Sequence, residues 1–276
     1  MIELRAPAKL NLCLYLGPTR DDGFHELASI FEPLSLHDLL RVTDHPSDEV
    51  ICPGVKGENL ATSALRLLRS EGWRRQPVRI EIEKNIPVQG GLGGGSADAA
   101  AVLRMAVGDV DDVAGLALML GADVPSQIDP APCLVEGVGQ KLTTIPDPAE
   151  HWIVLLPFEE GLSTAAVFRE ADRMGSGRSQ AEIDEISGRL WAVASGGVSP
   201  LAYPALLVND LETAAISLMP EVGLARQRME GAGAGFAGMT GSGPTVFGIF
   251  PDEESARTAA TELGEPAIVC QGGVGL

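Results

Sequence analysis

The stretch Pro87-Val-Gln-Gly-Gly-Leu-Gly-Gly-Gly-Ser96 decides the fold, because the sequence on either side of it predicts two clear elements. Residues 78–83 alternate apolar and charged side chains, a period of two that is typical of a strand. Residues 97–106 are rich in alanine, the strongest helix former. Glycine lets bare backbone approach a ligand, and the unpaired N–H groups at the start of a helix attract anions. The order strand, glycine loop, helix therefore predicts a phosphate site near Ser96; the alternative interpretation is a flexible connector or a tight helix entry.

Two familiar phosphate motifs do not describe this loop. A Walker A loop needs Gly-Lys-Ser/Thr before its helix, and no lysine follows Gly95. The segment Gly233-Ala-Gly-Phe-Ala-Gly238 has the G-x-G-x-x-G spacing, but it leads into a strand-like stretch instead of opening a helix. We therefore expect backbone amides to bind the phosphate, with positive charge supplied from elsewhere in the chain.

Lys9 is the candidate for that charge. Residues 9–16 alternate as a strand does, which places Lys9 and Asn11 on one face, about 7 Å apart. An unpaired ammonium among apolar neighbours is costly, so a carboxylate partner is expected. Asp123 lies in an apolar turn just past a predicted helix over 113–120. Together they could serve phosphoryl transfer, the aspartate accepting or orienting a hydroxyl proton and the lysine keeping it ionised and offsetting negative charge. The alternatives are a lysine that reaches water from a strand end and an aspartate that caps a turn.

The remaining patterns predict an α+β protein with two domains. Asn59 can cap a helix that runs to about Ser70. Further helices are predicted over 165–173, 181–194, 211–218, 221–230 and 252–263, and strands over 152–156, 235–239, 244–250 and 267–270. The prolines of Ile145-Pro-Asp-Pro148 predict a boundary between domains 1–148 and 149–276. The strand–helix–strand–strand–helix–strand order of the second domain is typical of a ferredoxin-like sheet.

Composition restricts the partners of the chain. Among 276 residues, 38 acids against 20 lysines and arginines give a net charge of −18, which excludes nucleic acid as the main partner and disfavours anionic membranes. Small phosphorylated ligands remain possible, because local donors decide their binding. The four scattered cysteines indicate reduced thiols, a cytoplasmic location and no zinc site. We expect no membrane span and no signal peptide, and the sequence leaves the oligomeric state open.

Three segments resemble the motifs of the GHMP kinases: Pro7-Ala-Lys-Leu-Asn-Leu12, the loop over 90–96 and Met239-Thr-Gly-Ser-Gly-Pro-Thr245. Asp22-Gly-Phe-His-Glu-Leu27, Gly121-Ala-Asp-Val-Pro125 and Thr164-x-x-x-Phe168 resemble more narrowly the branch that acts on 4-diphosphocytidyl-2-C-methyl-D-erythritol. The segments follow the family's order and span essentially the whole chain. The resemblance implies a two-lobed fold, with an N-terminal lobe like domain 2 of ribosomal protein S5, a ferredoxin-like C-terminal lobe and the site between them. It also implies phosphorylation of the substrate's 2-hydroxyl by ATP with Mg²⁺, in the non-mevalonate route to isoprenoid precursors.

The resemblance assigns roles to individual residues. Lys9 and Asp123 match the catalytic pair, and the metal ligands stay open. The positions that match the ATP site are Pro87, Gly90, Gly91, Leu92, Gly93, Gly94, Gly95 and Ser96, with Asn59 and Leu60 as the wall of the adenine pocket. The positions that match the acceptor site are Asn11, Phe24, His25, Thr164 and Phe168, with Gly241, Ser242 and Gly243 in the turn that closes it. Phe24, His25 and Phe168 would hold the cytosine.

The base-binding interpretation of Phe24 and His25 has an alternative, an aromatic side chain in the core beside a surface histidine. His37, His45 and His151 are expected at the surface. The chain also departs from the family pattern at Phe24 in place of tyrosine, at Gln89, at Ala97 and at Ser126-Gln127. Two other functions stay open: a GHMP kinase for a different small alcohol, and a catalytically silent nucleotide-binding module.

Overall fold

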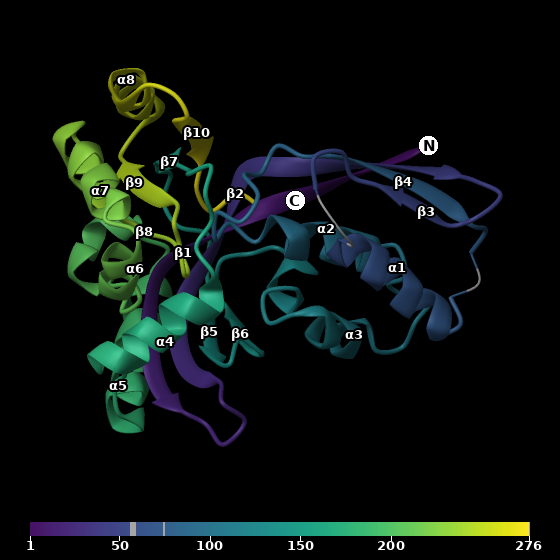
Figure 1. The fold of residues 1–276 in the computed structure, drawn as a ribbon, viewed down its shortest axis with the longest axis horizontal. Helices are drawn as coiled ribbons and strands as arrows, with labels where there is room; N and C mark the ends of the chain where they lie inside the picture. The colour runs from purple at the N-terminus through teal and green to yellow at the C-terminus, as the bar shows by residue number, and fades with distance from the viewer. Residues whose placement is uncertain (56–58, 74, 276) are drawn as a thin grey trace.

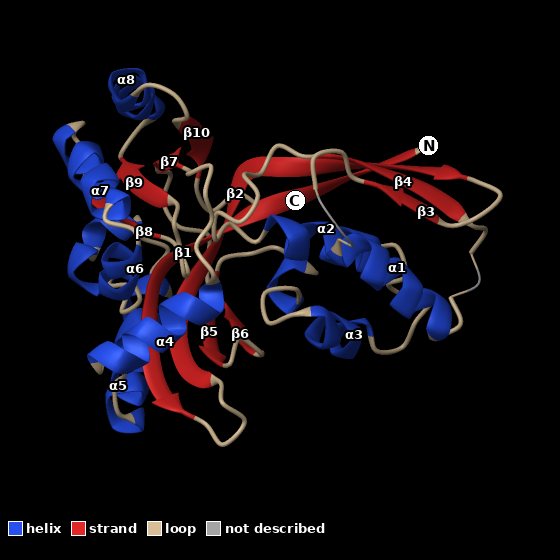
Figure 2. Cartoon of the chain, viewed as in Figure 1, coloured by secondary structure: helices blue, strands red, loops and turns tan. Residues whose placement is uncertain are grey.

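A computed structural model describes residues 1–55, 59–73 and 75–275 (Figure 1). The N-terminal half contains a sheet built on two long antiparallel strands, β1 (Ile2–Thr19) and β2 (His25–Asp44). Strand β2 also pairs with β4 (Val78–Glu83) and with β5 (Cys133–Gly137), and the edges are β3 (Glu49–Ile51) and β6 (Lys141–Thr144). The two long strands run from one half of the molecule into the other (Figures 1 and 2).

The C-terminal half contains a second antiparallel sheet with the strand order β10-β7-β9-β8. Its strands are β7 (Trp152–Leu156), β8 (Phe236–Met239), β9 (Val246–Phe250) and β10 (Ile268–Gln271). Helices α7 (Glu221–Gly231) and α8 (Glu253–Leu263) pack on this sheet. Numbered from β7, the order is 4-1-3-2, so the predicted ferredoxin-like arrangement is confirmed.

Helices α1 (Leu60–Ser70) and α2 (Gly94–Arg104) lie along the first sheet, and α3 (Val113–Leu120) packs against these two helices (Figure 2). Asn59 caps α1 by accepting a hydrogen bond of 2.8 Å from the Thr62 N–H, as predicted. The alanines of α2 are fully buried against α1 and β1, since small side chains allow close helix packing. Helix α2 begins at Gly94, three residues before the alanine-rich stretch over 97–106 that predicts it.

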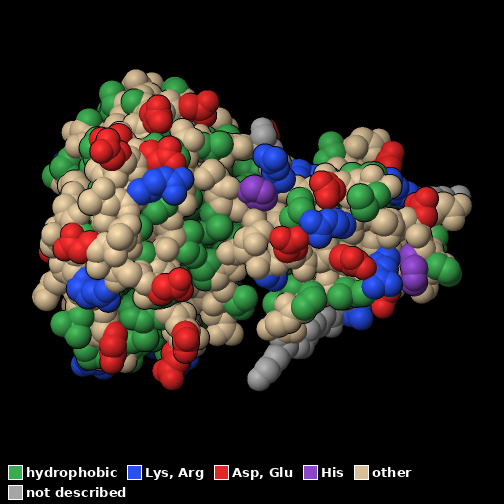
Figure 3. Space-filling view, turned by 90° about the horizontal axis from the view of Figure 1, so that it is seen from above, with side chains coloured by type: hydrophobic (Ala, Val, Ile, Leu, Met, Phe, Trp, Pro, Cys, Tyr) green, Lys and Arg blue, Asp and Glu red, His purple; other side chains and the backbone are tan. Residues whose placement is uncertain are grey.

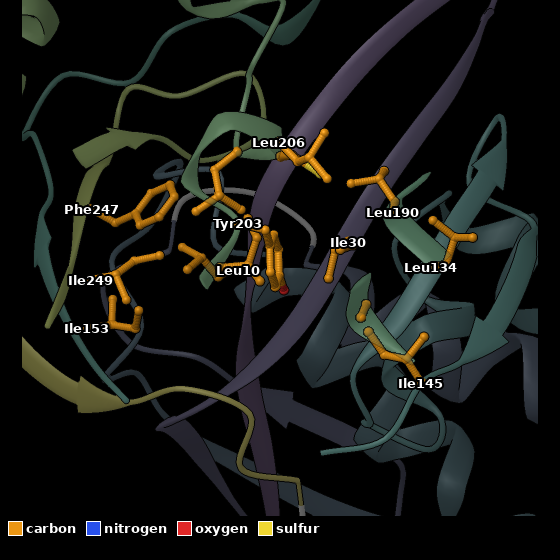
Figure 4. Close-up of a cluster of buried hydrophobic side chains, with 14 of the residues drawn as sticks. Leu10, Ile30, Leu134, Ile145, Ile153, Leu190, Tyr203, Leu206, Phe247 and Ile249 are labelled. Atoms are coloured by element: carbon orange, nitrogen blue, oxygen red, sulfur yellow. The ribbon is translucent and has the colours of Figure 1, made fainter. Parts of the chain in front are cut away.

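One hydrophobic cluster joins the two sheets. Leu10 and Ile30 from the first sheet pack with Ile153 and Phe247 from the second, around Tyr203 (Figure 4). Helix α5 (Gln180–Ala194) adds Leu190 to this cluster and contacts β1, β2 and β5. The remaining elements are α4 (Thr164–Met174), α6 (Glu212–Leu218) and the short 3₁₀ helices Pro125–Gln127, Pro200–Ala202 and Pro204–Leu206. The shared core fixes the two sheets against each other, so side chains from both can build one site.

The predicted helices and strands are confirmed, with ends that shift by at most a few residues, except that the strand predicted over 9–16 extends to Ile2 and Thr19. Lys9, Asn11, Cys13 and Tyr15 are all buried, because β1 is covered on both faces, so the alternative of a Lys9 side chain that reaches water is wrong. The domain boundary at 148/149 stays a prediction. No helix in the described ranges is long and apolar enough to cross a membrane, and Figure 3 shows acidic and basic side chains interspersed on one face.

Candidate active site

The buried lysine of β1 forms the centre of the site. Lys9 is 5% exposed, and its Nζ lies 3.4 Å from the Asp123 Oδ2 atom and hydrogen-bonds the Asn11 Oδ1 atom. The same ammonium lies 4.7 Å from the centre of the Phe31 ring, within cation–π range. The expected convergence of Lys9, Asn11 and Asp123 is therefore present, and the Asp123 side chain keeps 36% of its surface exposed toward the cavity.

The glycine loop adopts a conformation that requires glycine at two positions. Gly91 and Gly93 have φ values of +76° and +69°. A Cβ on Gly91 would lie 2.7 Å from the Thr240 carbonyl oxygen, and one on Gly93 would lie 2.8 Å from Cγ of Lys9. No side chain in the described chain caps α2 at Gly93, so the first N–H groups of the helix stay available to an anion.

Two cavities meet at this loop. The larger, of about 720 Å³, contains Lys9, Asn11 and Asp123. The smaller, of about 290 Å³, lies between the glycine loop and the wall formed by Asn59 and Leu60. Both cavities share Gly91, Gly93 and Ser96. A ligand in each would therefore meet at the N-terminus of α2.

Aromatic side chains line the far end of the larger cavity. His25 is 8% exposed, and its ring centre lies 5.6 Å from that of Phe168 on α4. Phe24 is 64% exposed and borders the same cavity. The alternative of a core phenylalanine beside a surface histidine is wrong, because Phe24 is exposed and His25 is buried. The His25 Nε2 atom lies 3.0 Å from the Asp172 Oδ1 atom.

The turn after β8 closes the site from the second sheet. Thr240 accepts a hydrogen bond of 2.9 Å at Oγ1 from the Asn11 N–H, and the Ser242 hydroxyl lies 2.9 Å from that of Thr164. The side-chain amide of Asn209 donates to the carbonyl oxygens of Met239 at 2.7 Å and of Gly241 at 2.8 Å. These contacts tie the turn to β1 and α4.

A buried charge cluster borders the smaller cavity. The Lys84 ammonium lies between the carboxylates of Asp38 and Asp98, 2.8 Å from the Asp98 Oδ2 atom. Burial raises the pKa of Asp98 to about 7, although the Lys84 ammonium opposes that shift. Asp38 also accepts hydrogen bonds from the N–H groups of Asn85 and Ile86, so the cluster anchors the segment that leads into the glycine loop.

The structure brings the predicted site residues together. All ten positions predicted for ATP line the smaller cavity. Lys9, Asp123 and the predicted acceptor residues line the larger one, except Gly243, which borders a neighbouring cavity of about 400 Å³ with Gln89. Sequence reasoning missed Phe31, Lys84, Asp98, Asp172 and Asn209. The spacing of Asp172, four residues after Phe168 on a predicted helix, could have placed it on the same face.

The surface position expected for His151 is wrong. His151 is fully buried, and its Nε2 atom lies 3.0 Å from the Glu32 Oε2 atom. Burial alone would lower the pKa of His151, but the hydrogen bond and charge of Glu32 raise it above its ordinary value. The four cysteines are free thiols, and the described residues contain no group of three or more His, Cys, Asp or Glu that could hold a metal ion.

Similarity to known proteins agrees with this geometry. The N-terminal domain model of the GHMP kinases matches residues 59–137, and the C-terminal model of these kinases matches residues 201–268. A 4-diphosphocytidyl-2-C-methyl-D-erythritol kinase of Syntrophotalea carbinolica is 38% identical, over 95% of this chain and 94% of that protein. The enzyme of the same name from Saccharopolyspora erythraea is 41% identical, over 95% of this chain and 87% of that protein.

Solved structures extend the comparison. A crystal structure of 4-(cytidine 5'-diphospho)-2C-methyl-D-erythritol kinase aligns with a TM-score of 0.83 and 34% identity, over 99% of this chain and all of that one. The homoserine kinase of Cytophaga hutchinsonii aligns with a TM-score of 0.70 at 18% identity, over 99% of this chain and 95% of that one, and so shares the fold. With its two sheets, its glycine loop and these relatives, the chain belongs to the 4-diphosphocytidyl-2-C-methyl-D-erythritol kinase family of the GHMP kinases.

Proposed function

We propose that this chain transfers the γ-phosphoryl group of ATP to the 2-hydroxyl of 4-diphosphocytidyl-2-C-methyl-D-erythritol. The relatives at 34–41% identity carry the name of that kinase. The observation that carries the proposal is the meeting of two cavities at Gly91, Gly93 and Ser96, with Lys9 and Asp123 on the side of the larger one. One cavity can hold the donor and the other the acceptor, with the transferred group between them.

The glycine loop supports nucleotide binding without a basic surface. The exposed N–H groups and the dipole of α2 favour a phosphate at its N-terminus. This local arrangement accounts for how a chain of net charge −18 can bind ATP. In the proposal, Pro87 and Gly90 to Ser96 surround the phosphates, and Asn59 with Leu60 forms the wall against the adenine.

The larger cavity supports a cytidylylated acceptor. Phe24 and Phe168 offer flat apolar faces for a pyrimidine, and His25 offers a hydrogen-bonding edge. Asn11 lies next to Lys9 at the opposite end, where the methylerythritol would lie. In the proposal, Thr164 and the turn from Gly241 to Gly243 close the cavity around the diphosphate.

Asp123 acts on the acceptor hydroxyl in this proposal. Its carboxylate accepts or orients the hydroxyl proton while the oxygen forms a bond to the γ-phosphorus and the bond from that phosphorus to the bridging oxygen of ADP breaks. Lys9, at 3.4 Å, stabilises the carboxylate and offsets the negative charge that develops on the transferred group. Asn11 and Phe31 hold the ammonium in place for both tasks.

The donor set fits Mg²⁺ bound mainly through the nucleotide. Mg²⁺ keeps several waters and takes one or two protein oxygens together with substrate phosphates. The described residues hold no cluster of three metal ligands, but the Ser96 hydroxyl borders both cavities and could supply such an oxygen. When bound, the ion neutralises phosphate charge. A cytoplasmic location, which the free thiols favour, also belongs to the proposal.

A coupled assay with purified protein, ATP and Mg²⁺ tests the proposal. We expect turnover with 4-diphosphocytidyl-2-C-methyl-D-erythritol and little or none with methylerythritol phosphate, which lacks the cytidine. Equal turnover of both acceptors would favour a GHMP kinase for another small alcohol. ATP binding without turnover of either acceptor would favour the silent nucleotide-binding module.

A further inference from the structure

A buried ion pair that the proposed mechanism does not use joins the two halves of the molecule. Glu32 of β2 and His151, just before β7, are 1% and 0% exposed, and the Glu32 Oε2 atom lies 3.0 Å from the His151 Nε2 atom. The other ring nitrogen, Nδ1, lies 3.0 Å from the carbonyl oxygen of Ala149. A carbonyl and a carboxylate only accept hydrogen bonds, so both contacts are satisfied when both ring nitrogens donate, as in the charged imidazolium. Although burial opposes it, the hydrogen bond and charge of Glu32 raise the pKa of His151, which favours that form.

The segment after β10 covers this pair. The Gly272 N–H donates to the His151 carbonyl oxygen at 3.3 Å, and the Val274 N–H donates to the Pro33 carbonyl oxygen at 3.2 Å. A Cβ on Gly272 would overlap the His151 Nε2 atom and would lie 3.0 Å from the Glu32 Oε2 atom, so bare backbone is needed there. The pair is therefore enclosed by three separate segments of the chain, and its charges interact strongly because water is excluded.

Glu32 lies between two residues of β2 that are neighbours of Lys9. The Phe31 ring centre lies 4.7 Å from the Lys9 ammonium, and Pro33 is the residue that pairs with Lys9 across the two strands. Pro33 has no N–H to donate to β1, and the Lys9 N–H donates to the Leu92 carbonyl oxygen instead. The backbone ladder between β1 and β2 is thus interrupted beside Lys9, so the position of Phe31 depends on what holds β2 from its other face. Because side chains alternate along a strand, that contact is the one made by Glu32.

We propose that the contact between Glu32 and His151 positions the Lys9 ammonium for phosphoryl transfer. The charged pair holds β2 in place, and β2 in turn holds the Phe31 ring against the ammonium. A displacement of about 1 Å at a reacting group can cost about 100-fold in rate, so a small shift of β2 is enough to lower kcat. The KM for ATP should change little, since other residues line the ATP cavity. This inference rests on the proposed function, because it requires Lys9 to act in the transfer.

The experiment measures kcat and KM from about pH 6 to about pH 9 for the parent and for Glu32→Gln, with ATP and the cytidylylated acceptor, at a temperature well below the Tm of both proteins. In the parent, His151 loses its charge as the pH rises through its folded pKa, which lies above 6.5, so kcat should fall by about 3- to 10-fold on the alkaline side. Glu32→Gln should show the lower kcat already near pH 6 and should lack the alkaline fall.

The other titratable groups near the pair do not produce this difference. Burial, together with the charge of Glu32, raises the pKa of the Tyr203 hydroxyl and raises that of the Cys270 thiol to about 12, so both stay neutral in this range. Asp98 borders the ATP cavity and burial raises its pKa to about 7, but it is the same in both proteins. The difference between the two kcat profiles therefore reports on the pair.

A second variant and a matched control separate positioning from stability. His151→Gln removes the charge from the other side and should give the same flat profile, and the double variant should cost no more in kcat than either single one, because both act through one contact. Asp210→Asn is the control: it weakens another ion pair, with Arg178, and should lower the Tm while keeping the parent's kcat profile.

The outcomes distinguish this inference from the proposed function. A Glu32→Gln protein with a lower Tm but the parent's kcat profile would show that the pair is only structural, which overturns the inference and leaves the kinase activity intact. Losses in kcat that add up in the double variant also overturn it. If the parent does not phosphorylate the cytidylylated acceptor at any pH, the proposed function fails and the inference fails with it.

Discussion

A lysine side chain at the middle of a covered strand needs several partners at once. The Lys9 ammonium, 5% exposed, would be costly to bury alone. The amide oxygen of Asn11, the carboxylate of Asp123 and the ring of Phe31 all lie around it, so its position is defined from three directions. The ammonium is already held where negative charge would develop. It therefore loses little conformational freedom when substrate binds.

Replacing the carboxylate tests the role of Asp123. In Asp123→Asn we expect kcat to fall by about 10²- to 10⁴-fold, because the amide cannot take up the hydroxyl proton. The KM for ATP should change little, since Asp123 borders the larger cavity and not the smaller one. Steady-state kinetics with each substrate varied in turn measure both quantities. Asp111→Asn, an exposed aspartate in the loop before α3, should match the parent, and near-normal turnover of Asp123→Asn would contradict the proton-acceptor role.

The residues that the sequence could identify are those that lie in local motifs. Lys9, Asp123 and the glycine loop each stand in a short segment whose composition is unusual for its predicted element. Asp172 and Asn209 gain their importance from contacts with segments far along the chain, His25 in one case and the turn after β8 in the other. His151 lies just before a strand, where the local sequence gives no sign of burial. Its partner Glu32 lies far away in the sequence, so the buried pair could not be predicted.

Among the elements, those with a regular period could be predicted, whereas strands β2, β3, β5 and β6 were not. Strand β7 and helices α1 and α3 have clear apolar patterns with capping or glycine ends, and their predicted ranges are confirmed. Strand β2 has 20 residues, and its burial changes along its length because it borders the cavity at one end and α2 at the other. Pro33 of β2 pairs with Lys9, next to a register shift between Pro7 and Lys9 of β1. A strand that changes environment has no constant period to detect.

The pair formed by Glu32 of β2 and His151, just before β7, should make the stability of the fold depend on pH. Glu32 raises the pKa of His151 above its unfolded value of 6.5, so the charged pair stabilises the fold fully below pH 6.5 and loses that contribution as the pH rises through the higher folded value. Thermal unfolding of the parent should therefore show a falling Tm from about pH 6.5 upward. In Glu32→Gln we expect a protein less stable by about 1–3 kcal/mol at pH 6 and a flatter profile across this range.

The parent's profile alone does not isolate His151. Burial raises the pKa of Asp98 to about 7, so Asp98 also lowers the stability of the fold as the pH rises. The comparison with Glu32→Gln is therefore needed. Asp98 is unchanged in Glu32→Gln, so the difference between the two profiles reports on His151. Glu262→Gln, at an exposed position on α8, should keep the parent profile. A Glu32→Gln protein with the parent's slope would show that the pair does not titrate with folding.

At the scale of the whole molecule, the glycine loop lies against segments of both sheets. The loop contacts the first sheet through the Lys9 N–H, which donates to the Leu92 carbonyl oxygen at 3.0 Å. It contacts the second sheet through Gly91, whose ideal Cβ would lie 2.7 Å from the Thr240 carbonyl oxygen. Since one core also joins the sheets, a ligand on this loop should stabilise both halves together, in a single unfolding transition.

This coupling gives a prediction for ATP binding. At a concentration 100 times its Kd, ATP should stabilise the parent by about 2.7 kcal/mol and raise its Tm by roughly 5–10 °C. Gly93→Ala should remove most of that rise, because the residue has a positive φ and its methyl group would displace Lys9 and close the space beside the helix N-terminus. Gly108→Ala is the control: its φ is +89° but no atom lies within 4 Å of its Cβ, so it should lower the basal Tm and keep the full rise with ATP. Differential scanning fluorimetry with and without ATP measures both, and a Gly93→Ala protein that keeps the parent's rise would show that the nucleotide does not bind at this loop.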